Sequence, residues 1–173
     1  MKRSFLTLSP QEALHVAIFI EERNAELYHR FAEMFVEFRD VESLEIAGVF
    51  WDMAVEEQHH SSKLQQLYTE RFGTAACAVT EEDIDEIIEL PKLDDGEVFN
   101  SSPGVSARER ALQVALKAEQ SARKYYSELA EHTADPKPRK LYSELAEFET
   151  DHIEFLARKL AETPAGNDGR MTN

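Results

Sequence analysis

Residues 53–60 read Met-Ala-Val-Glu-Glu-Gln-His-His, and this stretch decides the fold because it places a Glu-x-x-His pair inside a long amphipathic segment. A second such pair, Glu149 and His152, lies in residues 147–152, which read Glu-Phe-Glu-Thr-Asp-His. Side chains three positions apart lie on one face of a helix, about 5–6 Å apart at their Cβ atoms. A carboxylate and an imidazole held in this way can bind one metal ion. The first question is therefore whether each pair faces the interior or the solvent.

Helical phase answers that question for the first pair. The apolar residues here recur at spacings of three and four, and Glu57 and His60 fall in the same series: Ile46, Phe50, Met53, Glu57, His60, Leu64 and Leu67. A parallel series on the same segment is polar throughout: Asp52, Glu56, His59, Lys63 and Gln66. We therefore predict that Glu57 and His60 face inward, and that Glu56 and His59 face the solvent.

The same test finds a carboxylate in the apolar series of three further segments. The first segment has Leu14, Ile18, Glu21, Ala25, Tyr28, Ala32 and Phe35. The third has Leu112, Ala115, Glu119, Ala122, Tyr126 and Leu129, and the fourth has Tyr142, Leu145, Glu149, His152 and Leu156. The pairs Glu12/His15 and Glu26/His29 fall outside these series, and we expect them on the surface. The candidate metal ligands are thus Glu21, Glu57, His60, Glu119, Glu149 and His152.

The chain is predicted to be an all-α, four-helix bundle. Helix-start signals such as Ser9-Pro10-Gln11-Glu12 and breakers such as Gly73 place four helices at about residues 10–39, 42–71, 107–132 and 136–162. Residues 73–105 form a long crossover that contains a short helix after Thr80. Such a crossover can run the length of the bundle, which gives an up-down-down-up, ferritin-like topology. We assign one domain to residues 9–162 and a flexible tail to 163–173.

Composition narrows the range of functions. With 173 residues, 42% of them hydrophobic, the chain can bury the core of one domain. A formal net charge of −15 argues against a nucleic-acid partner, which requires a basic face. The apolar runs are too short for a membrane span, and the first residues lack the apolar core of a secretory signal, so we expect a cytoplasmic protein. The single cysteine, Cys77, excludes an internal disulfide.

An internal repeat indicates a site for two metal ions. Glu21 and Tyr28, like Glu119 and Tyr126, have the spacing Glu-x6-Tyr, and each pair precedes a helix with Glu-x-x-His. Four carboxylates brought together in a core would repel one another and lose their hydration, whereas two divalent cations would balance their charge. Carboxylate oxygens with two imidazoles suit iron, with manganese as the alternative. The competing interpretation is a core that tolerates a few polar residues.

One glutamate from each of two helices and Glu-x-x-His from the other two is the ligand pattern of the ferritin-like di-iron carboxylate superfamily. With the Glu-x6-Tyr spacing, residues 9–162 resemble its rubrerythrin-like branch. The resemblance implies that Glu57 and Glu149 bridge two irons and that Glu21, Glu119, His60 and His152 are terminal ligands. It also implies that Tyr28 and Tyr126 hydrogen-bond to ligand carboxylates, and that the protein is a homodimer.

Two departures from the family pattern leave the reaction open. The paired Cys-x-x-Cys motifs of a rubredoxin-like segment are missing, so electrons would come from a separate donor protein or from ferrous iron itself. Ala122 stands where rubrerythrins carry an extra glutamate associated with peroxide reduction. We expect an oxidoreductase whose di-ferrous site reacts with peroxide or O2. The alternatives are a ferroxidase for iron storage or delivery and a non-enzymatic bundle stabilised by metal.

Overall fold

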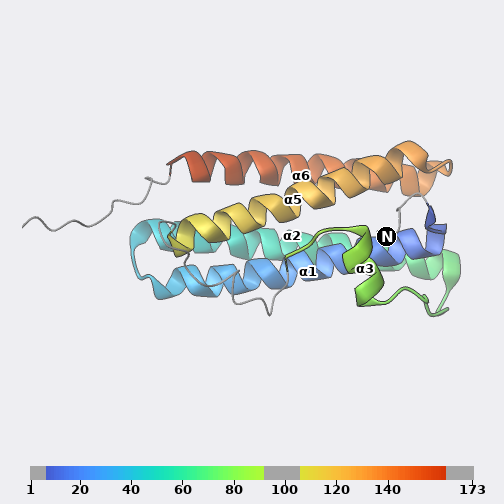
Figure 1. Ribbon diagram of the computed structural model, residues 1–173, viewed down its shortest axis with the longest axis horizontal. Helices are drawn as coiled ribbons and strands as arrows, with labels where there is room; N and C mark the ends of the chain where they lie inside the picture. The colour runs from blue at the N-terminus through green and yellow to red at the C-terminus, as the bar shows by residue number, and fades with distance from the viewer. Residues whose placement is uncertain (1–6, 92–105, 163–173) are drawn as a thin grey trace, which may run out of the picture.

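The computed structural model describes residues 7–91 and 106–162, and it confirms the predicted all-α, ferritin-like bundle. Four long helices form the bundle: α1 (Pro10–Glu37), α2 (Val41–Phe72), α5 (Ala107–His132) and α6 (Pro136–Glu162). A short helix, α3 (Glu81–Ile87), follows α2 (Figure 1). The remainder of the predicted crossover, residues 92–105, and the predicted tail, residues 163–173, lie outside the described residues.

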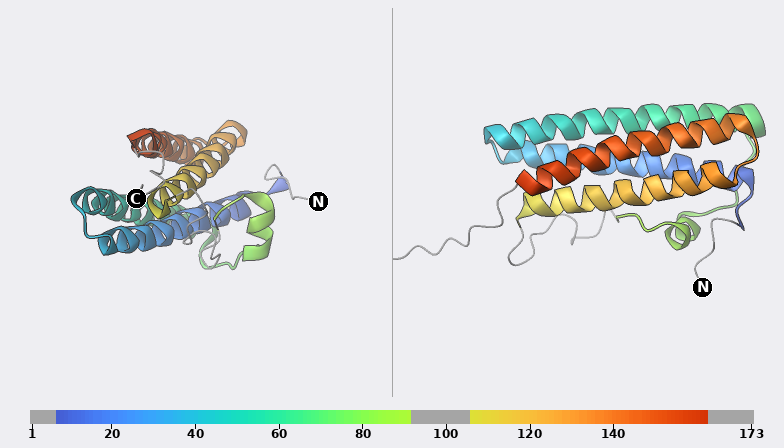
Figure 2. Two further views of the ribbon diagram at one scale, coloured as in Figure 1. Left: turned by 60° about the vertical axis from the view of Figure 1, so that its left-hand side comes forward. Right: turned by 90° about the horizontal axis from the view of Figure 1, so that it is seen from above.

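Two antiparallel hairpins, α1–α2 and α5–α6, pack against each other along their length (Figures 1 and 2). Helices α2 and α5 run in the same direction, so the chain crosses from one end of the bundle to the other between them. Helix α3 lies beside α1 on the outside of the bundle. This is the up-down-down-up arrangement expected from the length of the crossover.

Local signals explain where the helices begin and end. The Ser9 hydroxyl accepts from the Glu12 amide, and the Glu12 side chain accepts in return from the Ser9 amide, which starts α1. Helix α1 ends at Glu37, two residues earlier than predicted, because Arg39 takes a positive φ of 59° and turns the chain. Asp40 then caps α2, which Gly73 ends with a φ of 62°.

The core consists of two apolar clusters separated by a polar layer at mid-length. One cluster includes Leu14, Ile20, Leu64, Tyr126 and Leu145. The other includes Phe31, Phe35, Phe50, Leu112 and Leu156. On each long helix, the predicted glutamate lies between its residues of the first cluster and those of the second. The predicted apolar series are buried except at Ile18, which is partly exposed.

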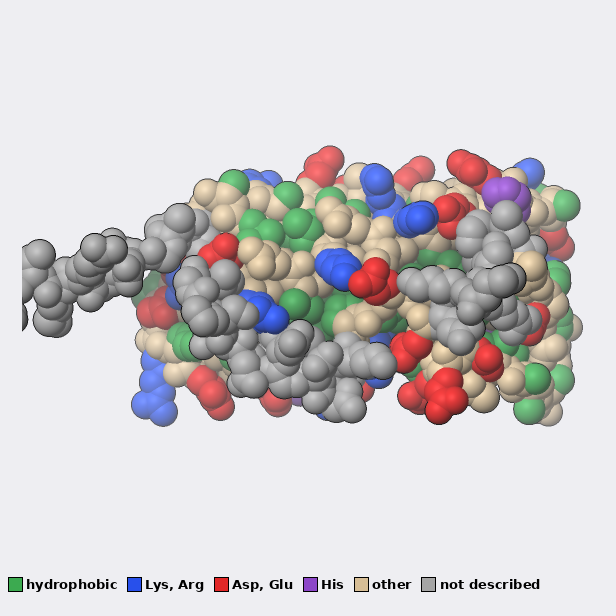
Figure 3. Space-filling model, in the orientation of Figure 1, with side chains coloured by type: hydrophobic (Ala, Val, Ile, Leu, Met, Phe, Trp, Pro, Cys, Tyr) green, Lys and Arg blue, Asp and Glu red, His purple; other side chains and the backbone are tan. Residues whose placement is uncertain are grey.

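Acidic and basic side chains are interspersed over the face shown in Figure 3. None of the helices within residues 7–91 and 106–162 has an apolar stretch that could span a lipid bilayer. The polar layer requires a chemical explanation, because it places charged side chains between two apolar clusters of the core.

Candidate metal centre

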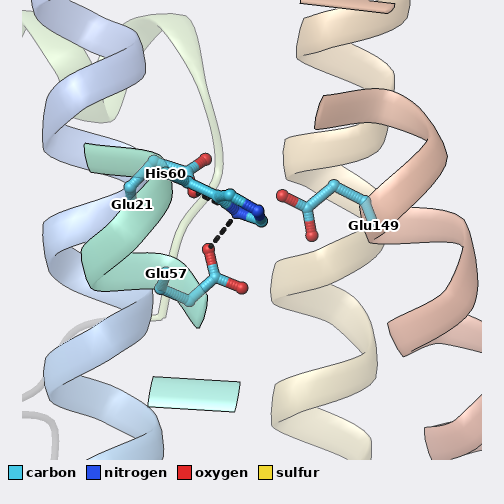
Figure 4. A group of neighbouring side chains, drawn as sticks. All are labelled: Glu21, Glu57, His60 and Glu149. Carbon is cyan, nitrogen blue, oxygen red and sulfur yellow. Dashed lines mark ion pairs between the residues drawn. The ribbon is translucent and has the colours of Figure 1, made fainter. Parts of the chain in front are cut away.

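Six buried side chains from the four long helices meet in the polar layer. Glu21 comes from α1, Glu57 and His60 from α2, Glu119 from α5, and Glu149 and His152 from α6. The four glutamates are 0% exposed, and His60 and His152 are 4% and 8% exposed. Figure 4 shows the Glu149 carboxylate pointing from α6 toward the side chains of the α1–α2 hairpin. The structure thus brings together all six candidate ligands.

The six residues form two overlapping groups. Ligand atoms of Glu21, Glu57, His60 and Glu149 all lie within 4.8 Å of one another. The same is true of Glu57, Glu119, Glu149 and His152. We call these groups the Glu21/His60 half-site and the Glu119/His152 half-site. Glu57 and Glu149 belong to both half-sites, which is the position that a bridging carboxylate needs.

In both histidines, Nδ1 is the ring nitrogen that faces the four buried glutamates of the cluster. His60 Nδ1 lies 3.2 Å from Glu21 Oε2 and 3.7 Å from Glu57 Oε2. His152 Nδ1 lies 3.3 Å from Glu57 Oε1, 3.5 Å from Glu119 Oε1 and 3.7 Å from Glu149 Oε2. The i,i+3 spacing within α2 and α6 produces the contacts of each histidine with its own Glu-x-x-His glutamate.

Two tyrosine hydroxyls donate to carboxylates across the α1–α5 interface. Tyr28 of α1 donates to Glu119 of α5, and Tyr126 of α5 donates to Glu21 of α1. Burial, followed by the charge of Glu119 for Tyr28 and of Glu21 for Tyr126, raises the pKa of each hydroxyl well above its usual value. Both tyrosines therefore remain protonated and orient the carboxylates of the two half-sites.

The electrostatics of the cluster reflect four carboxylates in a dry core. Burial and the nearby Glu57 charge raise the pKa of Glu21 well above its usual value, and burial and Glu119 do the same for Glu149. Burial opposes charge on Glu57 as well, but the nearby imidazoles of His152 and His60 outweigh it and lower the pKa of Glu57 to about 2. Burial would lower the pKa of His60, yet Glu21 and Glu57 raise it to about 9. In the protein alone, protons balance the negative charge.

The donor atoms of the cluster fit a pair of divalent cations. Eight of its buried oxygen and nitrogen atoms have no hydrogen-bond partner among the described residues: Glu21 Oε2, both oxygens of Glu57 and Glu149, Glu119 Oε2, and Nδ1 of His60 and His152. Buried polar atoms without partners are rare and costly. Here they converge, and their carboxylate and imidazole chemistry suits iron or manganese.

The Glu-x-x-His pairs outside the apolar series do not belong to the buried cluster. Glu26 and His29 are exposed on α1, as predicted, whereas Glu12 and His15 are only partly exposed. Trp51 and Gln120 lie on the surface, and Trp51 packs against His29. His59 is exposed as well.

The prediction for Glu56 was incomplete. Its side chain is 55% exposed, but its Oε2 lies 2.8 Å from His152 Nε2 on α6. Helical phase describes which face of α2 a residue occupies. It does not show that a long side chain beside the apolar series can reach the neighbouring helix.

Asn24 was also missed. Its side chain is fully buried, one turn after Glu21, and neither amide atom has a hydrogen-bond partner among the described residues. The spacing of three from Glu21 was the available signal, but the apolar series continues through its neighbour Ala25. At the position equivalent in the internal repeat, three residues after Glu119, stands Ala122, also fully buried.

Comparison with known proteins agrees with this geometry. The family model described as Rubrerythrin matches residues 12–95 and 110–171, and the chain therefore belongs to the rubrerythrin family. No curated protein matches at a significant level.

Two solved structures of similar proteins share the fold. An uncharacterised conserved protein from Magnetospirillum magnetotacticum MS-1 is 25% identical, with a TM-score of 0.71 over 92% of this chain and 99% of that one. A hypothetical protein from Pyrococcus furiosus is 24% identical, with a TM-score of 0.72 over 91% of each chain. Neither is described by an activity.

Proposed function

We propose that the protein is a rubrerythrin-type oxidoreductase that holds two iron ions and reacts with peroxide or O2. The observation that supports this most strongly is the pair of half-sites, which share Glu57 and Glu149 in a core whose described residues include no other charged side chain. Four carboxylates would balance the charge of two divalent ions. The ions would in turn supply partners for the carboxylate oxygens and imidazole nitrogens that have none. Glu21 and His60 would hold one ion, and Glu119 and His152 the other.

Two ferrous ions held there would supply the two electrons that, with two protons, reduce one hydrogen peroxide to two waters. The chain supplies the geometry for this reaction. Tyr28 and Tyr126 fix the terminal carboxylates by donating to Glu119 and Glu21. The apolar clusters on both sides of the polar layer limit the access of water. A separate electron donor protein would return the centre to the reduced state.

The experiment is anaerobic loading with Fe²⁺ followed by rapid mixing with hydrogen peroxide or O2. We expect oxidation of two irons per peroxide, faster than that of free Fe²⁺, and loss of the effect in Glu57→Ala. The double variant Glu26→Ala/His29→Ala is the matched control, because it removes a Glu-x-x-His pair from the exposed face of α1. This control should react like the wild type.

Two results would count against the proposal. Oxidation no faster than that of free Fe²⁺ would reject a reactive iron centre. If O2 is the preferred oxidant and each chain oxidises many added Fe²⁺ ions in succession, the protein is a ferroxidase instead.

A further inference from the structure

The two half-sites have the same ligands but different neighbours. In the internal repeat, Glu57 and His60 of α2 correspond to Glu149 and His152 of α6. The residue before each shared glutamate therefore occupies an equivalent position. That residue is Glu56 in α2 and Phe148 in α6. Each contacts the histidine of the opposite helix, so one histidine meets a carboxylate and the other meets an aromatic ring.

A carboxylate holds the outer nitrogen of His152. Glu56 Oε2 lies 2.8 Å from His152 Nε2, while His152 Nδ1 faces the carboxylates of Glu57, Glu119 and Glu149. When Nε2–H donates to Glu56, the proton is fixed on the outer nitrogen and the Nδ1 lone pair is directed into the cluster. Such an outer carboxylate orients a metal-binding imidazole and increases its basicity.

At the equivalent position beside His60, the neighbour is the apolar side chain of Phe148. The His60 ring lies 4.9 Å from the ring of Phe148, centroid to centroid. Among the described residues, no group hydrogen-bonds to His60 Nε2. The Lys63 ammonium lies 5.7 Å from the centroid of the Phe148 ring. The Glu21/His60 half-site therefore has a cation and a phenyl ring in its surroundings, whereas the Glu119/His152 half-site has an anion.

We propose that the two positions bind divalent cations with unequal affinity, that the Glu119/His152 position is the tighter, and that Glu56 is the positioning residue responsible. The Glu21/His60 position is then the one that fills last and loses its ion first. This inference rests on the proposed two-metal function. It adds the order of filling and a role for a residue outside the six ligands.

Single-position variants allow each affinity to be measured separately. Glu21→Ala removes the terminal carboxylate of one half-site, and Glu119→Ala removes that of the other. Cobalt(II) is the probe, followed by calorimetry and by its visible absorption. We expect Glu21→Ala, which retains the His152 position, to bind cobalt about 10-fold more tightly than Glu119→Ala, because loss of an outer partner typically costs 10–100-fold in metal affinity.

Variants of Glu56 in the two backgrounds identify the cause. In the Glu21→Ala background, Glu56→Ala should weaken cobalt binding by about 10-fold or more, and Glu56→Gln by less, because the amide oxygen can still accept from Nε2–H. In the Glu119→Ala background, both variants should change the affinity by less than about twofold. Glu45→Gln, an exposed change on the same helix, controls for surface charge. In the wild type, cobalt should bind in two steps of different affinity, and the two affinities should become similar in Glu56→Ala.

The outcomes separate the two proposals. If wild-type protein binds no cobalt, the two-metal function itself fails. If two ions bind but the single positions have equal affinities, the centre stands and the inequality is wrong. If Glu56→Ala weakens both positions equally, the role assigned to Glu56 is wrong. Equal effects of Glu56→Gln, Glu56→Ala and Glu45→Gln would assign the change to surface charge and reject the positioning role.

Discussion

The two half-sites of the centre are alike in their inner residues and unlike around them. Each has a terminal glutamate, a histidine whose Nδ1 faces inward, and a tyrosine that donates from the opposite hairpin. The surrounding residues differ. Glu56 contacts the histidine of one half-site, whereas Phe148 contacts the histidine of the other. At another pair of equivalent positions, one half-site has Asn24 and the other has Ala122. The comparison indicates that charge balance constrains the ligands in both half-sites. The residues around the ligands can differ, and they can make the metal affinities of the two positions unequal.

The largest expected effect comes from a ligand that both half-sites share. Protein purified from iron-replete cells should contain about two metal ions per chain, and Glu57→Ala should lose most of both, because Glu57 belongs to both groups. Glu21→Ala and Glu119→Ala should each lose about one ion. Elemental analysis of the purified proteins measures this. Full metal retention in Glu57→Ala would show that the metal is bound elsewhere.

Metal removal should destabilise the whole bundle. A ligand present at about 100 times its Kd stabilises the folded state by about 2.7 kcal/mol, which for a domain of this size corresponds to a Tm change of roughly 5–10 °C. Thermal unfolding with and without a chelator tests this. The chelator should have no effect on Glu57→Ala. A wild-type Tm that does not respond to the chelator contradicts a bound metal centre.

The metal-free and metal-loaded proteins should respond to pH in opposite directions. In the metal-free protein, the pKa of His60 is raised from 6.5 to about 9, so the stability it contributes is complete below pH 6.5 and is lost as the pH rises through about 9. The raised pKa values of Glu21 and Glu149 act in the same direction. Metal binding displaces these protons, so metal affinity should rise over the same range.

Urea unfolding of the chelated protein between pH 6 and pH 9 measures the first trend, and cobalt titration measures the second. If the stability of the chelated protein rises with pH over this interval, the described balance of protons and carboxylates is incorrect.

A substitution at Phe148 should reduce the difference between the half-sites. Phe148→Glu places a carboxylate where Glu56 stands in the other half, so it should strengthen cobalt binding at the Glu21/His60 position by up to about 10-fold. Calorimetry in the Glu119→Ala background measures this affinity. Phe148→Gln is the control without charge. Weaker binding in Phe148→Glu than in Phe148→Gln would count against an equivalent role for the two positions.

The smallest expected effect is at Asn24. Its amide is buried without a partner among the described residues, so Asn24→Ala should lower the free energy of unfolding by less than about 1 kcal/mol. Leu27→Ala, a buried apolar change on the same helix, should lower it by about 2–5 kcal/mol. Chemical denaturation compares the two variants. A cost above about 2 kcal/mol for Asn24→Ala would show that the amide makes a strong interaction in solution.

The fold could be predicted because periodicity, caps and breakers all agreed. Ser9, Asp40 and Gly73 set helix ends, and the apolar series around Glu57 determined which face is buried. The six clustered residues could be predicted for the same reason, since each interrupts an apolar series at mid-length. The contact of Glu56 could not be predicted, because its partner His152 lies on another helix and 96 residues away in sequence. Periodicity within one helix contains no information on that contact.

The most direct test is anomalous X-ray scattering from crystals of the iron-loaded protein. The account predicts two peaks, one among Glu21, Glu57, His60 and Glu149 and the other among Glu57, Glu119, Glu149 and His152, with the second the more fully occupied at limiting iron. A single peak, or peaks away from these six residues, would contradict a centre of two metals bridged by Glu57 and Glu149.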